Sequence, residues 1–263
     1  MTIDIYQIDA FTDRLFGGNP AAVCPLNDWL SDDLLLSIAK ENNLAETAYF
    51  IHKNDNIFHL RWFTPEIEMD LCGHATLASA FVIMECLDYN VDQVYFDTMS
   101  GQLSVSKTNG ELEMNFPSRP PSPIDLPEVI ANALSIQPQE VFKARDYMLV
   151  YESEQQLSDL KVNASKLEGL NLDPGGIIAT AKGDDSDFVS RFFTPGAAVF
   201  EDPVTGSAHC TLTPFWADRL DKKELHAFQI SERLGELHCR IEGDRVYIKG
   251  SAVKYLEGTI DLP

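Results

Sequence analysis

Arg61-Trp62-Phe63-Thr64-Pro65 occurs a second time, with one change, as Arg191-Phe192-Phe193-Thr194-Pro195. The step from 61 to 191 is 130 residues, about half of the 263-residue chain. A repeat on this scale decides the architecture of a whole chain, so it is considered before any single motif. The two segments indicate that one folding unit is present twice.

Further matches flank this pair in the same order. Residues 44–48 align with 177–181 at a displacement of 133, which puts Ala179 at the position of Glu46. Residues 72–75 align with 205–208, again at 133, so that Thr205 matches Cys72. Four matches at nearly constant displacement favour a duplication over chance. The remaining matched pairs are Gly101 with Gly235 and Gly110 with Gly243.

A proline-rich stretch marks the predicted boundary between the units. Residues 117–123 contain four prolines, which can continue neither a helix nor a central strand. We therefore expect a first unit over 1–120 and a second over 121–263. The last residues, 251–263, are left over after the final predicted strands, so the C-terminus is expected to cross back to the first unit.

One helix in each unit indicates how the units are built. Residues 74–87 (HATLASAFVIMECL) are apolar around nearly the whole helix circumference, so this helix must be buried on all sides. Residues 207–220 form the matching helix, which Pro214 is expected to kink or shorten. A sheet that curls around each helix satisfies this burial, so the expected fold is α+β with two pseudo-symmetric barrel-like units. Alternating patterns predict strands at 1–10, 47–51, 57–63, 94–97, 102–106 and 111–116, with turns at 109–110 and 242–243.

Composition excludes several classes of function. The chain has 20 Lys and Arg against 41 Asp and Glu, a formal net charge of -21, which repels nucleic acid and anionic membrane surfaces. No apolar run approaches the roughly 20 residues that span a bilayer. The N-terminus lacks the features of a signal peptide, and the five cysteines have no paired spacing, so a reduced cytoplasmic protein without disulfides is expected.

Each buried helix begins directly after a glycine turn. Gly73-His74 starts the first helix and Gly206-Ser207 starts the second. Unpaired backbone N–H groups and the helix dipole make such a start an anion site. If the units face each other about a pseudo-twofold axis, both sites converge on one cleft that suits a small acid. Taken singly, each glycine is explained by a tight turn into a helix.

Three polar side chains near these starts are candidates for chemistry. Glu46 lies among apolar residues, where a carboxylate loses hydration and can accept and return a proton, although an exposed Glu paired with Lys is the alternative. Asp202 is close enough to the second helix to cap it or to face the cleft. His74 is expected to be neutral because of the helix dipole, and a lone His is more often structural.

Sharper motifs are absent from the sequence. Asp70, Cys72 and His74 have the spacing of ligands, but no second cluster accompanies them, so no metal site is expected. A Cys–His dyad is recognised by its geometry and not by sequence proximity, so a thiol hydrolase is not favoured. No glycine pattern of a dinucleotide fold or a P-loop occurs, and nothing in the sequence implies a cofactor.

The ordered motifs together resemble the phenazine-biosynthesis-like (PhzF-type) family over essentially the whole chain. The resemblance implies a diaminopimelate-epimerase-like fold, commonly in a homodimer, and isomerase chemistry without metal or cofactor, in which Glu46 moves a proton on the substrate. It also implies that His74, Asp202 and Ser207 surround the substrate, here a small carboxylic acid. The motifs are 16–23 (FGGNPAAV), 43–48 (NLAETA), 61–65 (RWFTP), 71–76 (LCGHAT) and 201–208 (EDPVTGSA).

One departure from the wider superfamily bears on mechanism. Thiol-dependent epimerases of this fold use two opposed cysteines, whereas here Cys72 keeps the first position and Thr205 takes the second. A hydroxyl is too weak an acid to replace a thiolate, so a two-thiol racemase is disfavoured. A Cys72-dependent epimerase with another partner and a non-catalytic binding protein remain alternatives. The expected catalytic residues are Glu46, His74 and Asp202, and the expected substrate-binding residues are Cys72, Gly73, Ala75, Thr205, Gly206 and Ser207.

Overall fold

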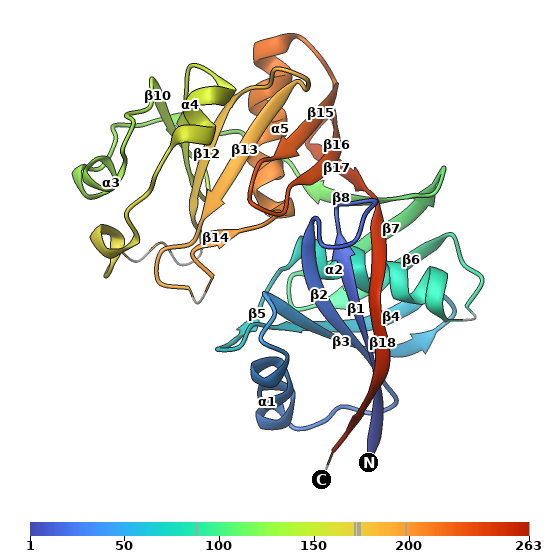
Figure 1. The fold of residues 1–263 in the computed structure, drawn as a ribbon. Coiled ribbons are helices and arrows are strands. Elements are labelled where there is room, and N and C mark those ends of the chain that lie inside the picture. The colour runs from blue at the N-terminus through green and yellow to red at the C-terminus, as the bar shows by residue number, and fades with distance from the viewer. Residues whose placement is uncertain (88, 171, 173–174, 198, 263) are drawn as a thin grey trace. The chain divides into compact units, whose positions relative to one another are not determined.

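The computed structural model describes residues 1–263 except 88, 171, 173–174, 198 and 263. The chain forms two compact units, one of residues 1–116 with 248–263 and one of residues 117–247 (Figure 1). The first 117 residues contain β1 (Thr2–Ala10), β2 (Asn19–Leu26), α1 (Asp32–Asn42), β3 (Glu46–Asn54), β4 (Ile57–Phe63), β5 (Glu68–Met69), α2 (Gly73–Phe81), the π-helix η1 (Val82–Cys86), β6 (Gln93–Thr98), β7 (Gly101–Thr108) and β8 (Glu111–Pro117).

The remaining elements belong mainly to the second unit. The exception is the last strand, β18 (Ala252–Asp261), which is part of the first unit. The elements are β9 (Ser122–Pro123), α3 (Glu128–Ala133), β10 (Glu140–Lys143), β11 (Tyr147–Val150), α4 (Glu154–Asp159), the 3-10 helix η2 (Ala164–Leu167), β12 (Ile177–Lys182), β13 (Phe188–Phe193), β14 (Glu201–Asp202), α5 (Gly206–Leu220), β15 (Glu224–Gln229), β16 (Gly235–Glu242), β17 (Arg245–Gly250) and β18 (Ala252–Asp261).

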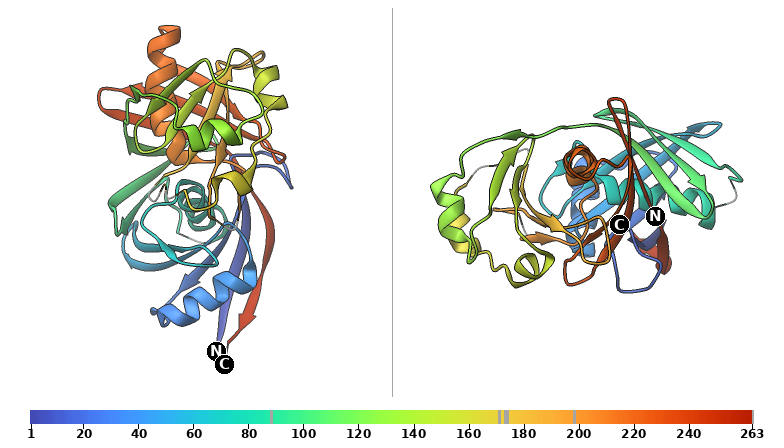
Figure 2. Two further views of the ribbon diagram at one scale, coloured as in Figure 1. Left: turned by 90° about the vertical axis from the view of Figure 1, so that its left-hand side faces the viewer. Right: turned by 90° about the horizontal axis from the view of Figure 1, so that it is seen from above.

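The sheet of the first unit curls around α2, as the apolar circumference of this helix predicts (Figure 1). All residues of α2 from Gly73 to Ala80 are buried, and the helix lies against β1, β2 and β3. Strand β1 pairs with β18 on one side and with β2 on the other, so the two ends of the chain lie side by side (Figure 2). The predicted buried central helix is confirmed.

The second unit repeats the strand order of the first. In the first unit, β2–β3 is parallel, β3–β4 is antiparallel and β4–β6 is parallel. In the second unit, β11–β12, β12–β13 and β13–β15 are parallel, antiparallel and parallel in the same order. Arg61 makes two hydrogen bonds to Glu68, of 2.6 and 2.7 Å, and Arg191 makes two to Glu201, of 2.7 and 2.8 Å. The duplication read from the sequence is therefore present in three dimensions.

Strand pairing corrects one part of the repeat alignment. Tyr49 lies opposite Arg61 in the β3–β4 pair, and Ala179 lies opposite Arg191 in the β12–β13 pair. Ala179 therefore corresponds to Tyr49, and the displacement is 130 along both strands. The position that corresponds to Glu46 is Gly176, just before β12. The alignment of 44–48 with 177–181 was wrong, because the alanines and threonine of β12 match those of the first unit even when the strand is shifted by three residues.

Pro214 was expected to kink or shorten the second central helix, and the shortening does not occur. Helix α5 runs unbroken from Gly206 to Leu220 with Pro214 inside it. Proline has no N–H to donate to the carbonyl four residues earlier, which is that of Cys210. The backbone N–H of Arg119 donates to this carbonyl instead, at 2.9 Å. The proline-rich segment 117–123, which belongs to the second unit and is not the boundary expected at 120, thus takes up the carbonyl that the helix leaves without a donor.

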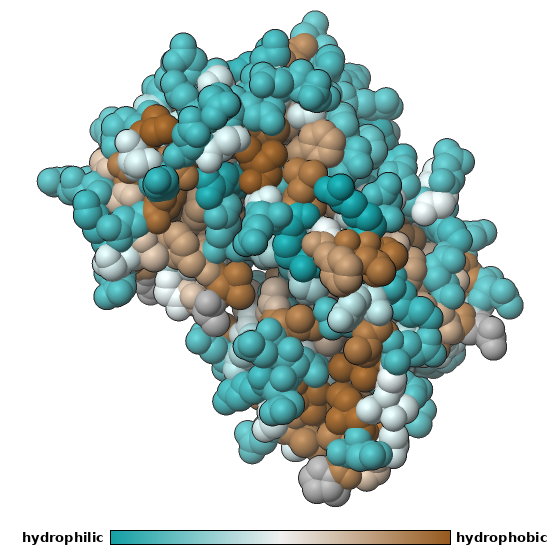
Figure 3. Space-filling model, viewed as in Figure 1, coloured by the Kyte–Doolittle hydropathy of each residue, from teal (hydrophilic) through white to brown (hydrophobic). Residues whose placement is uncertain are grey.

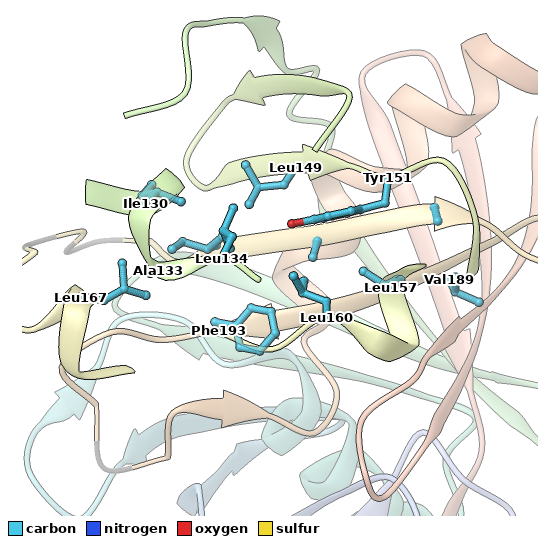
Figure 4. Close-up of a cluster of buried hydrophobic side chains, with 13 residues drawn as sticks. Ile130, Ala133, Leu134, Leu149, Tyr151, Leu157, Leu160, Leu167, Val189 and Phe193 are labelled. Atoms are coloured by element: carbon cyan, nitrogen blue, oxygen red, sulfur yellow. The ribbon is translucent and has the colours of Figure 1, made fainter. Parts of the chain in front are cut away.

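The second unit has a substantial apolar core of its own, shown in Figure 4. Residues of α3, α4, η2 and strands β11 to β13 meet there, with the Tyr151 ring among Leu, Ile and Val side chains. The face in Figure 3 is mostly hydrophilic, in keeping with the net charge of -21, and carries an apolar stripe over strands of the first unit. Among the described residues, no helix combines the length and apolar character needed to cross a bilayer.

Candidate active site

Glu46 is the first residue of β3, where the strand enters the sheet between β2 and β4. Its neighbour across the parallel ladder is Ala21. Side chains alternate between the faces of a strand, so Glu46 shares its face with Ala48 and Phe50, both buried. The contact of Glu46 with His74 shows that this is the face toward α2. The side chain of Glu46 is 14% exposed and lies beside a histidine, not a lysine.

Cys72 and His74 are brought to Glu46 by the start of α2. Cys72 is the N-cap of this helix, with extended backbone, and His74 is in the first turn. Glu46 Oε2 lies 3.0 Å from His74 Nε2. On the other edge of the imidazole, Nδ1 lies 3.6 Å from Cys72 Sγ and 3.1 Å from Asn19 Nδ2. Asn19, Glu46 and Cys72 therefore surround the buried imidazole of His74.

Two atoms of this cluster lack a satisfied hydrogen bond. Among the described residues, Glu46 Oε2 and His74 Nε2 are buried and have no partner of acceptable hydrogen-bond geometry, although they are 3.0 Å apart. Native proteins seldom leave buried polar groups in this state, and such groups are typical of sites that bind or react. The pair therefore has hydrogen-bonding capacity that a bound substrate could use.

The charge state of His74 corrects the expectation of a neutral imidazole. Burial by itself lowers the pKa of His74, but the interactions with Cys72 and Glu46 act in the opposite direction and prevail, so the pKa is raised well above its ordinary value. A carboxylate at 3.0 Å outweighs the partial charge of a helix start.

Asn19 is a site residue that the sequence analysis included in a motif but did not select. It is fully buried at the start of β2 and contacts His74 Nδ1. A neutral imidazole with its proton on Nε2 accepts from the amide nitrogen of Asn19, whereas an imidazolium donates to the amide oxygen after a half-turn of the amide. Asn19 can therefore hold the ring in either charge state, which suits a positioning residue.

The environment of Cys72 disfavours the thiolate form of its side chain. Burial, followed by the nearby Glu46 carboxylate, raises the pKa of Cys72 to about 11, and the opposing effects of His74 and the Ala75 backbone N–H are smaller. The thiolate is the nucleophile and the base, so a thiol with this pKa is almost entirely protonated at neutral pH. This environment disfavours Cys72 as the proton-transferring group.

In the second unit, hydrogen bonds link Asp202, Thr205 and Gln229 to one another. The Thr205 hydroxyl donates to Asp202 Oδ2 at 2.5 Å, and Thr205 N donates to Gln229 Oε1 at 2.8 Å. The amide nitrogen of Gln229 donates to the Asp202 carbonyl at 2.8 Å. Asp202 therefore accepts from a hydroxyl. Gln229 is fully buried on β15, and no motif in the sequence pointed to it.

The start of α5 differs from the start of α2 in having one partly exposed residue, Ser207. Thr205 is the N-cap, Gly206 is buried, and Ser207 is half-buried in the first turn. His209 is fully buried, and burial lowers its pKa to about 4, against a smaller effect of the Thr205 carbonyl, 2.9 Å from its Nδ1. His209 is therefore neutral at pH 7, unlike His74.

A metal ion has a possible ligand set in the first unit. Glu46, Cys72 and His74 each offer one ligand atom, and these atoms lie within 4.8 Å of one another. The spacing seen in sequence, Asp70 with Cys72 and His74, is not this set, because Glu46 takes the place of the exposed Asp70. Carboxylate, thiolate and imidazole are ligands of Zn²⁺, but the high pKa of Cys72 works against thiolate formation.

Comparisons with known proteins agree over the full length of the chain. The family model described as phenazine biosynthesis-like protein matches residues 8–258. A protein of Pseudomonas aeruginosa named as an uncharacterized isomerase is 47% identical over 262 residues, with 100% of both chains covered. The crystal structure of a PhzF-family phenazine biosynthesis protein from Enterococcus faecalis has a TM-score of 0.93 and 42% identity, again with 100% of both chains covered.

A more distant solved structure extends the likeness in fold. A hydroxyproline epimerase from Agrobacterium vitis, with trans-4-hydroxy-L-proline bound, has a TM-score of 0.63 and 9% identity, and the match covers 98% of this chain and 92% of that one. At this identity the likeness concerns the fold alone. It confirms the expected epimerase-like architecture.

Proposed function

This chain belongs to the phenazine biosynthesis-like protein family, and we propose that it is an isomerase in which Glu46 transfers a proton on a small carboxylic acid. The observation that carries the proposal is the buried pair of Glu46 Oε2 and His74 Nε2, 3.0 Å apart and without hydrogen-bond partners among the described residues. Curated relatives named as isomerases support the reaction class.

The proposed reaction needs one base. The Glu46 carboxylate removes a proton from an activated C–H bond of the substrate and returns it to another carbon of the same conjugated system, so the composition of the substrate is unchanged. The neighbouring His74 imidazole, 3.0 Å away, holds the Glu46 side chain in place. Asn19 fixes the His74 ring from its other edge.

Substrate binding is assigned to the helix starts. The backbone N–H groups of Gly73, His74 and Ala75 at the start of α2 attract a carboxylate because they carry the positive end of the helix dipole. We extend the binding role to Cys72 in the first unit and to Asp202, Thr205, Gly206 and Ser207 in the second. The motif resemblance supports this extension, and the hydrogen bond from Thr205 to Asp202 holds these two side chains together.

Thiol-dependent epimerisation by Cys72 is the second candidate. The fold shared with a hydroxyproline epimerase and the position of Cys72 at a helix start favour it. The pKa of about 11 and the presence of Thr205 at the matching position of the second unit count against it. The two candidates differ in which side chain the reaction cannot do without.

An isotope-exchange experiment tests the proposal. The purified chain is incubated in D₂O with a panel of small carboxylic acids that have an activated C–H bond, and loss of the proton signal is followed by NMR. We expect exchange of at least one compound with the wild type and with Glu66→Gln, an exposed control. Glu46→Gln should not catalyse it. Exchange that persists in Glu46→Gln and is lost in Cys72→Ala would establish the thiol mechanism instead, and binding without exchange would indicate a binding protein.

A further inference from the structure

The outer face of the β15–β16 pair carries an unusual set of side chains. Leu225, Ala227 and Leu237 point inward and are buried. The alternate residues therefore face outward. They form three cross-strand pairs, which are Glu224 with Arg240, His226 with His238, and Phe228 with Glu236.

The middle pair places two imidazoles side by side with a carboxylate next to them. His226 lies directly opposite His238, and their rings are stacked with centroids 4.9 Å apart and an interplanar angle of 14°. Glu236 precedes His238 by two residues on the same face, and its Oε1 lies 2.7 Å from His226 Nε2. One ligand atom from each of the three residues lies within 4.8 Å of the others.

We propose that His226, His238 and Glu236 bind a borderline divalent metal ion such as Zn²⁺ on the surface of the second unit. Two imidazole nitrogens and one carboxylate oxygen are a ligand set that Zn²⁺ accepts, and the remaining position is filled by water. Tetrahedral bonds of the usual length place ligand atoms about 3.3 Å apart. The three ligand atoms lie within 4.8 Å of one another, so metal binding would require the side chains to rotate toward that separation.

The backbone under the proposed site is firmly held. The His226 N–H donates to Asp187 Oδ2 at 2.9 Å, and the His226 carbonyl accepts from the Asp187 N–H, also at 2.9 Å. The Phe228 ring packs edge-on against His226, with centroids 4.8 Å apart. Strand-borne ligands on a fixed backbone lose little conformational entropy when a metal binds, which favours affinity.

The charges around the site do not oppose a cation. Arg240, the nearest basic residue along β16, is paired with Glu242 at 2.6 Å and lies over the Tyr247 ring. Asp187, which accepts from the His226 N–H, is paired with Lys222, and Glu224 lies opposite Arg240, so the neighbouring basic residues have acidic partners. The role that follows is structural, because the metal would link β15 to β16 and thereby stabilise the second unit against unfolding.

Metal titration of the untagged full chain tests the proposal. After treatment with a chelator and removal of the chelator, Zn²⁺ binding is measured by calorimetry and the thermal midpoint is followed with and without Zn²⁺. Co²⁺ spectra report the ligands. We expect the wild type to bind one ion with nitrogen and oxygen ligands and to melt at a higher temperature with Zn²⁺. His226→Gln and His238→Gln should each weaken this binding by at least about tenfold.

Two control variants and one further ligand variant make the result decisive. His52→Ala removes a histidine of the first unit outside the proposed site and should leave Zn²⁺ binding unchanged. Cys72→Ala removes a ligand of the other possible set, so a thiolate band in the Co²⁺ spectrum that this variant abolishes would place the metal there. Glu236→Gln keeps both imidazoles and should weaken binding less than the loss of a histidine. The proposal is overturned if both His→Gln variants bind Zn²⁺ and respond thermally as the wild type does, since His226 and Glu236 would then form only an ion pair.

Discussion

The carboxylate of Glu46 lies 3.0 Å from the imidazole of His74, although 27 positions of sequence, from 47 to 73, separate the two residues. Strand β3 supplies the first and the start of helix α2 supplies the second. Interactions with Cys72 and with Glu46 raise the pKa of His74 above that of an ordinary histidine, in spite of its burial. Glu46 is also the group whose loss should stop the proposed reaction.

Replacing Glu46 with Gln should abolish turnover while the fold and ligand affinity are retained. Gln has the size and hydrogen-bonding ability of Glu but cannot carry the transferred proton, so kcat falls more than binding does. The expected loss is about 10²–10⁴-fold, the usual effect of removing a general acid or base. Steady-state kinetics together with thermal melting separate this effect from misfolding.

Cys72→Ala is the matched variant for that measurement, and it should retain most of the activity. The reverse pattern, with full activity in Glu46→Gln and none in Cys72→Ala, would contradict the assignment of the base.

Cysteine labelling should follow burial and not the proximity of a cysteine to the proposed site. Cys86 is half-buried, whereas Cys72 is 6% exposed and has a pKa of about 11. At pH 8 only about one Cys72 in a thousand is a thiolate, so iodoacetamide should modify Cys86 first. Mass spectrometry of peptides taken at successive times measures the order.

Unfolded protein, in which all five cysteines react, is the reference for this experiment. Rapid modification of Cys72 in the native protein would show a reactive thiolate and would favour the epimerase candidate.

His209 should make the protein less stable as the pH falls from 7 to 5. Its pKa is about 4 in the folded chain and about 6.5 in the unfolded chain, so the unfolded chain binds more protons between these values. The contribution of this residue to the free energy of unfolding should fall by about 2 kcal/mol over that interval. Denaturant unfolding at pH 7 and pH 5, with the wild type and His209→Phe, isolates the effect.

His74 acts in the opposite direction, because its raised pKa adds stability below the unfolded pKa and loses it as the pH rises through the folded pKa. The test is therefore the difference between wild type and variant. An equal loss in both would show that His209 is not the residue responsible.

Gly176→Ala should destabilise the second unit by roughly 1–3 kcal/mol, the usual cost of overpacking. A Cβ at this position would lie 2.4 Å from the end of the Phe192 ring and 2.8 Å from the Phe193 carbonyl oxygen, which cannot move aside easily. The free energy of unfolding in urea measures the cost.

Gly258→Ala serves as the control, because its Cβ would meet nothing closer than the Leu256 side chain at 4.0 Å. Equal stability of the two variants would argue against the tight packing at Gly176 and against the register that makes this position the counterpart of Glu46.

Sequence alone determined the features that depend on local pattern. The RWFTP and RFFTP segments revealed the duplication, because both copies keep the arginine that pairs with a glutamate on the next strand. The apolar circumference of residues 74–87 predicted a helix enclosed by a sheet, since such a helix has no side that can face water. Motif order was enough to indicate the family and to select Glu46.

Only the tertiary structure decided which atoms meet. Sequence matching made Ala179 the equivalent of Glu46 in the second unit. The strand registers make Gly176 the equivalent instead, because register is fixed by contacts between strands and not by similarity along them. Asn19 belongs to a motif that does not reveal its role, and Gln229 belongs to none, since both roles arise from contacts with a neighbouring helix or strand. The charge of His74 likewise follows from a carboxylate that folding brings within 3.0 Å, which no local pattern records.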